Sequence, residues 1–212
     1  MGKRLMIIAL LLAAAFAGGD EIKWTKSKEL KPFPITTTYS DVTITPEKAR
    51  DKYTISWSPA TRINAVEFID ITYLSWEFYC AAAKDAVKNG KTEAARAGKD
   101  AESIRGQLEG EVIIKAAISV NDRSAVDLLN PYKWTSTAVI NGLQIEGQIS
   151  NANLIIFPAP KFHNNSISIS YPVTTVLFVF TLPPGANPQT GTKIVPRNGD
   201  FAHGFEWRFQ QL

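Results

Sequence analysis

Cysteine is nearly absent from this sequence, because Cys80 is the only one among 212 residues. An intramolecular disulfide and a cysteine-based zinc site are therefore excluded. Cys80 stands between Tyr79 and Ala81, and we interpret it as a small buried apolar residue. A chain of this length can bury enough surface to fold without a disulfide.

Histidine is also scarce, and the common catalytic motifs are missing. The two histidines, His163 and His203, lie far apart in the sequence, and neither belongs to an H-E-x-x-H pattern. The sequence also lacks the G-x-S-x-G and S-x-x-K patterns of serine nucleophiles. We therefore expect no metal and no other cofactor, and we favour a non-catalytic protein over an enzyme.

Long apolar runs are missing except at the N-terminus. Lys3 and Arg4 precede an apolar stretch at 5–17, which ends with the small residues Ala15 and Ala17, and the sequence then turns polar at once. This order is typical of a cleavable signal peptide. The run is shorter than the about 20 residues that a membrane-spanning helix needs. We predict a signal peptide at 1–17, export to the periplasm or the extracellular space, and no stable membrane span after cleavage.

A marked excess of charge is missing as well. The chain has 23 basic and 20 acidic side chains, so removal of Lys3 and Arg4 reduces the excess from three to one. Nucleic-acid binding requires a clustered basic face, and we expect none. The segment 85–92 (DAVKNGKT) partly matches a phosphate-binding loop, but Asp85 stands where the first glycine belongs. We therefore expect no nucleotide either, and we interpret the lysines of 23–31 as a solvated tail.

Most of the chain shows strand patterns. Val, Ile and aromatic residues are dense or alternate with polar ones, and Asn141-Gly142 is the preferred pair of a two-residue hairpin turn. These patterns predict one domain at 18–212 that is mainly β, an antiparallel β-sandwich. The predicted strands include 36–45, 52–57, 66–74, 112–120, 134–140, 143–149, 173–182 and 205–209.

One segment has a helical pattern instead. In 76–109, apolar or small residues recur every three or four positions, which predicts two helices at 76–89 and 92–109. Asn89-Gly90 indicates the end of the first helix, and Thr92 is a candidate N-cap of the second. We predict a helical hairpin inserted into the sandwich.

The candidate site residues come from weak signals. His163 and His203 lie in predicted loops and would form an acid–base or metal site with Asp200 if the fold brings them together. Trp24 and Trp134 are the tryptophans whose surroundings least define a core position, so they are candidates for a binding face. The Pro- and Gly-rich segment 183–200 is either a contact loop or disordered.

Two functions remain open at this point. The leading hypothesis is an exported, non-catalytic module that binds or assembles with a protein or polysaccharide partner. The alternative is an exported hydrolase that uses Asp and Glu side chains or the His163/His203 pair. A flat exposed aromatic patch would favour binding, and a pocket lined by two carboxylates or both histidines would favour the enzyme.

Overall fold

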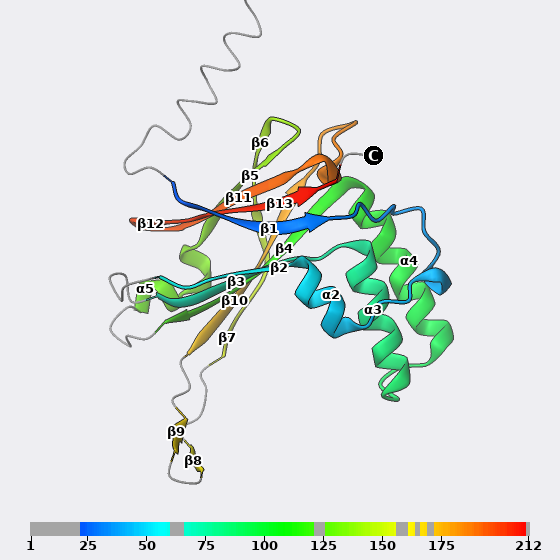
Figure 1. Cartoon of the computed structure of the whole chain (residues 1–212), viewed down its shortest axis with the longest axis horizontal. Coiled ribbons are helices and arrows are strands. Elements are labelled where there is room, and N and C mark those ends of the chain that lie inside the picture. The colour runs from blue at the N-terminus through cyan, green and yellow to red at the C-terminus, as the bar shows by residue number, and fades with distance from the viewer. Residues whose placement is uncertain are drawn as a thin grey trace, which may run out of the picture.

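A computed structural model of the chain describes residues 22–59, 66–120, 126–155, 161–163, 166–168 and 172–210 (Figure 1). For 126, 151–155, 161–163 and 166–168 it describes the backbone alone. The predicted signal peptide at 1–17 lies outside the described residues.

The first of two large sheets contains both ends of the described chain. Its strand order is β1-β13-β11-β5-β6, with β12 paired to β11. β1 and β13 run parallel, whereas the other pairs are antiparallel. The strands are β1 (Trp24–Leu30), β5 (Thr135–Ile140), β6 (Leu143–Glu146), β11 (Thr192–Asn198), β12 (Phe201–Ala202) and β13 (Gly204–Phe209).

The second sheet is antiparallel throughout, in the order β2-β3-β4-β10-β7. A separate two-stranded hairpin is formed by β8 and β9. The strands are β2 (Thr54–Trp57), β3 (Val66–Tyr73), β4 (Glu111–Val120), β7 (Gln148–Ile155), β8 (Lys161–His163), β9 (Ser166–Ser168) and β10 (Val173–Thr181).

The two sheets enclose one aromatic core, which confirms the predicted mainly β, sandwich-like fold. In β10 every second residue is buried, so Val176, Phe178 and Phe180 point inward. They belong to the same cluster as Phe205 and Trp207 of β13 in the opposite sheet. Burial of such side chains is the main source of stability, at roughly 25 cal/mol per Å² of apolar surface.

Three helices lie together beside the sandwich, and a short fourth lies on its other side (Figure 1). They are α2 (Pro46–Tyr53), α3 (Trp76–Lys88) and α4 (Ala94–Gly110), with α5 (Val126–Leu129) apart from them. The predicted helical hairpin is confirmed as α3 and α4. Gly90 has a positive φ of 66°, and its N–H and that of Lys91 bond to the carbonyls of Val87 and Ala86, which closes α3.

The N-terminal quarter differs from the prediction in three places. The lysine-rich 23–31 segment is not a tail, because 24–30 form β1 at a sheet edge, where lysines keep an exposed strand soluble. The segment 36–45 is not a strand but irregular chain with a 3-10 turn at Tyr39–Asp41. Helix α2 takes the place of the first part of the 52–57 strand, because Thr45 caps it and Pro46 fits its first turn.

Two further differences concern caps and loops. Helix α4 begins after Glu93, so Thr92 is not its N-cap. The segment 183–200 is not irregular throughout, because 192–198 form β11 in the middle of the first sheet. The β-branched pair Ile194 and Val195 is buried there, and this packing outweighs the neighbouring glycines and prolines.

The hairpin turn is confirmed, but the strand after it is divided. Asn141 and Gly142 have φ of 53° and 76°, as a type I′ turn requires. The predicted strand 143–149 instead breaks at Gly147, where the chain leaves β6 of one sheet and enters β7 of the other. A Cβ on Gly147 would lie 2.7 Å from the Phe180 ring, so only glycine fits this crossing without a shift of the core.

Candidate functional site

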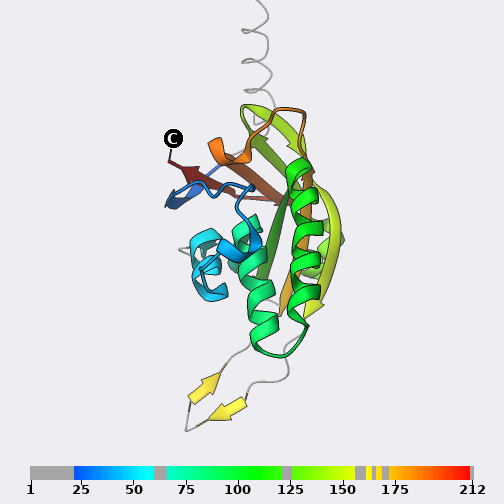
Figure 2. The same ribbon diagram turned by 90° about the vertical axis from the view of Figure 1, so that its right-hand side faces the viewer.

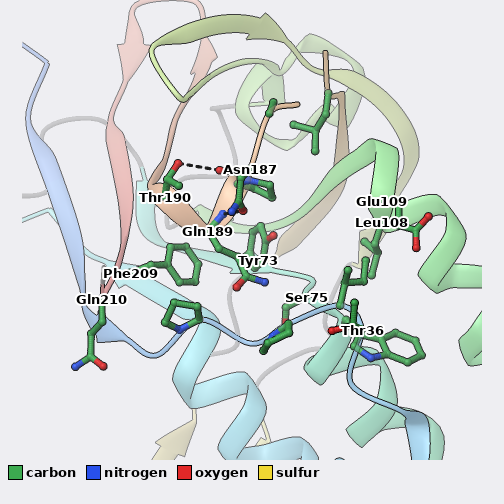
Figure 3. A pocket seen from close by; sticks show the side chains of 17 residues that line it. Thr36, Tyr73, Ser75, Leu108, Glu109, Asn187, Gln189, Thr190, Phe209 and Gln210 are labelled. Atoms are coloured by element: carbon green, nitrogen blue, oxygen red, sulfur yellow. Dashed lines mark hydrogen bonds between the residues drawn. The ribbon is translucent and has the colours of Figure 1, made fainter. Parts of the chain in front are cut away.

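A pocket of about 650 Å³ lies where the helices meet the end of the sandwich (Figure 3). Its walls are the N-terminal segment 32–36, the start of α3, the end of α4, the loop 182–190 and the end of β13. Figure 2 shows the N-terminal segment, in blue, crossing beside the helices below the orange loop. The volume falls in the range of about 300–1,000 Å³ that is usual for small-molecule sites.

Tyr73, the last residue of β3, provides a buried polar side chain of the lining, as does Ser75. Tyr73 is 7% exposed, and its ring packs against those of Trp207 and Phe209, with centroids 6.0 and 6.3 Å away. Burial raises the pKa of its phenol well above the usual range, so the hydroxyl stays protonated. Among the described residues no side chain or backbone group forms a hydrogen bond with this hydroxyl.

Hydrogen bonds hold the loop and the N-terminal segment against each other. Gln189 Nε2 donates to the carbonyl of Phe33 at 2.6 Å, and Asn187 Oδ1 accepts from the backbone N–H of Gln189 at 2.9 Å. Thr190 Oγ1 donates to the Asn187 carbonyl at 2.9 Å (Figure 3). These bonds are made within the protein itself, so its own contacts hold the two walls in place.

The aromatic side of the pocket is anchored in the same way. Trp76, at the start of α3, donates from Nε1 to the carbonyl of Thr37 at 2.8 Å. Ser75 caps α3 by accepting from the backbone N–H of Phe78. The start of a helix therefore fixes one wall of the pocket, and the bond from Trp76 ties the N-terminal segment to it.

A partly buried ion pair between Lys52 and Glu77 lies behind Tyr73 of the pocket lining. Glu77 of α3 accepts from Lys52 Nζ at 2.6 Å and from the Tyr53 hydroxyl at 2.5 Å. Burial, followed by the bond to Glu77, raises the pKa of Tyr53 above its usual range. The ring centroid of Tyr53 lies 6.0 Å from that of Tyr73, so these contacts link helices α2 and α3 to Tyr73 in the pocket lining.

His203 lies at the junction of the two sheets and is 5% exposed. Its Nε2 shares a hydrogen bond of 2.8 Å with Thr25 Oγ1, and its ring stacks on Trp57 at 4.3 Å. Burial and, to a lesser extent, Lys23 lower the pKa of His203 to about 4, so the ring is neutral at neutral pH. These contacts give His203 a packing role.

No contact among the described residues places Asp200 or His163, the other members of the predicted acid–base site, beside His203. Asp200 is exposed in the turn between β11 and β12. His163 lies in β8, and the β8–β9 hairpin projects beyond the ends of β7 and β10, away from β12 (Figure 1). Because the side chain of His163 is outside the described residues, the joint histidine site stays a prediction.

The two candidate binding tryptophans have different positions. Trp134 is completely buried in the core and donates from Nε1 to the carbonyl of Leu128 at 2.9 Å, so it cannot contribute to a binding face. Trp24 is half-buried at the start of β1, where its ring lies against Gly204. Lys193 Nζ lies 5.5 Å from the centre of that ring. Trp24 thus packs on the first sheet and lies outside the pocket.

Cys80 is fully buried on α3, as its neighbours indicated, and burial raises the pKa of its thiol to about 12. The residues that line the pocket were not identified from the sequence. Tyr73 ends a strand whose sequence pattern does not differ from that of the other strands. The pocket forms only when segments that are distant in the sequence come together. The single usable signal was the segment 183–200, because its residues 186–190 form one wall.

The described residues contain no cluster of three or more His, Cys, Asp and Glu side chains that fits a metal ion. Within the same residues, no helix has the length and apolar character needed to cross a membrane. No protein-family model, no curated protein and no solved structure matches the chain.

Proposed function

We propose that the chain is an exported, non-catalytic binding module whose pocket between the helices and the sandwich holds a small, largely apolar molecule. The observation that carries this proposal is a pocket of about 650 Å³ lined mainly by uncharged groups. Its walls combine prolines and apolar side chains with a few fixed polar ones. Tyr73, Trp76 and Phe209 provide aromatic surface for a ligand.

The composition of the lining supports binding over hydrolysis. Acid–base catalysis needs at least one group that exchanges a proton near neutral pH, and commonly two. Among the described residues that line the pocket, Glu109 is the only carboxylate, and none is His, Cys, Lys or Arg. Glu109 is also exposed to solvent at the end of α4.

A small ligand fits the structure better than the macromolecular partner expected from the sequence. Among the described residues, the exposed large hydrophobic side chains are Tyr132 and Leu143, and only the first is aromatic. A flat aromatic patch of the kind that stacks on sugars or on another protein would need several such side chains.

Export remains part of the proposal and rests on the apolar run at 5–17. Mass spectrometry of the protein recovered from outside the cytoplasm tests it directly. The mature chain should begin at Gly18. A chain that retains Met1 and the apolar run would contradict cleavage.

The binding function is tested with phenylnaphthylamine, an uncharged apolar fluorophore that brightens in apolar surroundings. Ala186 is half-buried in the loop wall and outside the core, so Ala186→Trp should fill the pocket without loss of folding. We expect the fluorophore to bind the native protein and Ala186→Trp to weaken it by about tenfold or more, equal to about 1.4 kcal/mol.

The matched control is Ala95→Phe, which adds a large side chain at an exposed position of α4 that does not line the pocket. Its affinity should equal that of the native protein. Absence of fluorophore binding, or equal binding by Ala186→Trp, would contradict the proposed function.

A further inference from the structure

The hydroxyl of Tyr73 is a hydrogen-bond donor that has no partner among the described residues. Ser136 Oγ is the only fully enclosed side-chain polar atom without a partner among the described residues, so the Tyr73 hydroxyl retains an opening. Tyr73 lines the pocket and is 7% exposed, which places that opening in the pocket. Three surrounding rings, those of Tyr53, Trp207 and Phe209, fix its orientation.

The other polar side chains of the inner walls are already engaged. Ser75 caps α3, and Gln189 bonds to the Phe33 carbonyl. Asn187 and Thr190, which are exposed at the rim, bond within their own loop. Among the described residues, Tyr73 is therefore the buried lining group whose hydroxyl has no hydrogen bond of its own, and being protonated it can donate to an acceptor oxygen of a ligand.

The described lining has no buried group of opposite charge that would stabilise a charged ligand. A buried carboxylate needs a cation or several donors, and the lining residues that the structure describes include no Lys, Arg or His. A buried ammonium needs an anion, and the one lining carboxylate, Glu109, is exposed at the rim (Figure 3). Ligands with a full charge would lose their hydration without an equivalent contact inside.

The rim does not resemble a membrane-docking surface. Its exposed lining residues are polar apart from Pro34, and they include Thr36, Asn187 and Gln210. The exposed large hydrophobic residues of the described chain, Tyr132 and Leu143, do not belong to the lining. A pocket that takes lipid from a bilayer would have an apolar or basic rim.

From these four observations we infer that the pocket selects an uncharged amphiphile taken from solution. The ligand has an apolar body that fills the pocket and one hydrogen-bond-accepting oxygen that binds the Tyr73 hydroxyl. This inference rests on the proposed binding function and adds the chemical class of the ligand.

The test displaces phenylnaphthylamine from the native protein with three molecules that share one alkyl chain: lauryl alcohol, laurate and laurylamine. We expect the alcohol to compete at about tenfold lower concentration than either charged molecule. Equal competition by all three would overturn the inference and leave the proposed function standing. Failure of the fluorophore itself to bind would contradict both this inference and the proposed function.

A second measurement tests the contribution of the Tyr73 hydroxyl to binding. Tyr73→Phe should weaken binding of lauryl alcohol by about three- to tenfold, the usual effect of one hydrogen bond. The same variant should bind pyrene, which has no hydrogen-bonding atom, as well as the native protein does. Tyr132→Phe, at an exposed position outside the pocket, is the matched control and should change neither affinity. Unchanged affinity of Tyr73→Phe for the alcohol would overturn the role of this hydroxyl.

Sedimentation with vesicles of phosphatidylcholine, a zwitterionic lipid without net charge, tests the source of the ligand. The protein should stay in the supernatant while lauryl alcohol still binds below its solubility limit. Co-sedimentation of the protein with the vesicles would contradict uptake from solution.

Discussion

His203 and Tyr73 are both buried polar residues, but they differ in their hydrogen bonding. The imidazole of His203 has a partner in Thr25 and lies between aromatic rings. The hydroxyl of Tyr73 has no partner among the described residues and opens into the pocket. Burial shifts the pKa of both groups in the direction that keeps them uncharged, so both are neutral at neutral pH.

The neutral state of His203 makes stability depend on pH. An unfolded histidine takes up a proton below about pH 6.5, whereas folded His203 resists it until about pH 4. The unfolded state therefore binds more protons in this window, and stability should fall as pH falls from about 6.5 to about 4, by about 3 kcal/mol at most. Above pH 6.5 the contribution is fully present.

Urea unfolding at pH 7 and pH 4.5 measures this loss. His203→Gln removes the titrating group while leaving an amide that can bond to Thr25, so its free energy of unfolding should change less between the two pH values. Equal pH dependence of the native protein and His203→Gln would show that another group is responsible.

At the scale of elements, the sandwich depends on the chain's crossing from one sheet to the other at Gly147. The Gly147 N–H donates to the Ser136 carbonyl at 2.8 Å, which ties the start of β7 to β5. The ring of Phe180 fills the space where a side chain would begin. This glycine joins β6 and β7, which lie in different sheets.

Gly147→Ala should lower the free energy of unfolding by about 1–3 kcal/mol, because the added methyl group overpacks a fully buried ring. The matched control is Gly106→Ala in α4, where a Cβ meets no atom within 4 Å. That variant should raise stability by up to about 1 kcal/mol through helix propensity. Thermal or urea unfolding checks both. A Gly147→Ala protein as stable as the native one would contradict the crossing geometry.

The ion pair between Lys52 and Glu77 connects the end of α2 to the first turn of α3. Lys52→Met should lower the free energy of unfolding by roughly 2 kcal/mol, because Glu77 would keep a buried charge without a cation, and partial exposure of Lys52 moderates the cost. Adding Glu77→Gln to that variant should restore most of the loss.

Lys48→Met is the control for this pair, because no ion pair to Lys48 is found among the described residues. It should be close to neutral in urea unfolding. If the double variant were less stable than Lys52→Met alone, the loss would not come from an unpaired Glu77.

At the scale of the whole molecule, the features that the sequence predicts are those decided locally. The alternation of β10, the turn at Asn141-Gly142 and the end of α3 at Gly90 each depend on a few neighbouring residues. Together they were enough to predict a sandwich with a helical hairpin.

The features that the sequence did not predict depend on distant partners. β1 is a strand because β13, nearly 180 residues later, pairs with it, and β11 is one because β5 and β13 lie on its two sides. The pocket needs five separate segments to meet. Helix α2 is different, because Thr45-Pro46 is a local signal for the start of a helix. We predicted a strand there because we gave more weight to the alternation of Tyr53, Ile55 and Trp57.

The central claim is that the pocket beside the helices is the binding site, and an amide NMR titration of the native protein with phenylnaphthylamine tests it most directly. We expect the largest shifts at the pocket amides of Thr36, Ser75 and Gln189, and little change along the exposed face of α4 at 94–100. Shifts centred on another surface, such as the outer edge of β1, or shifts spread evenly over the chain, would contradict the claim.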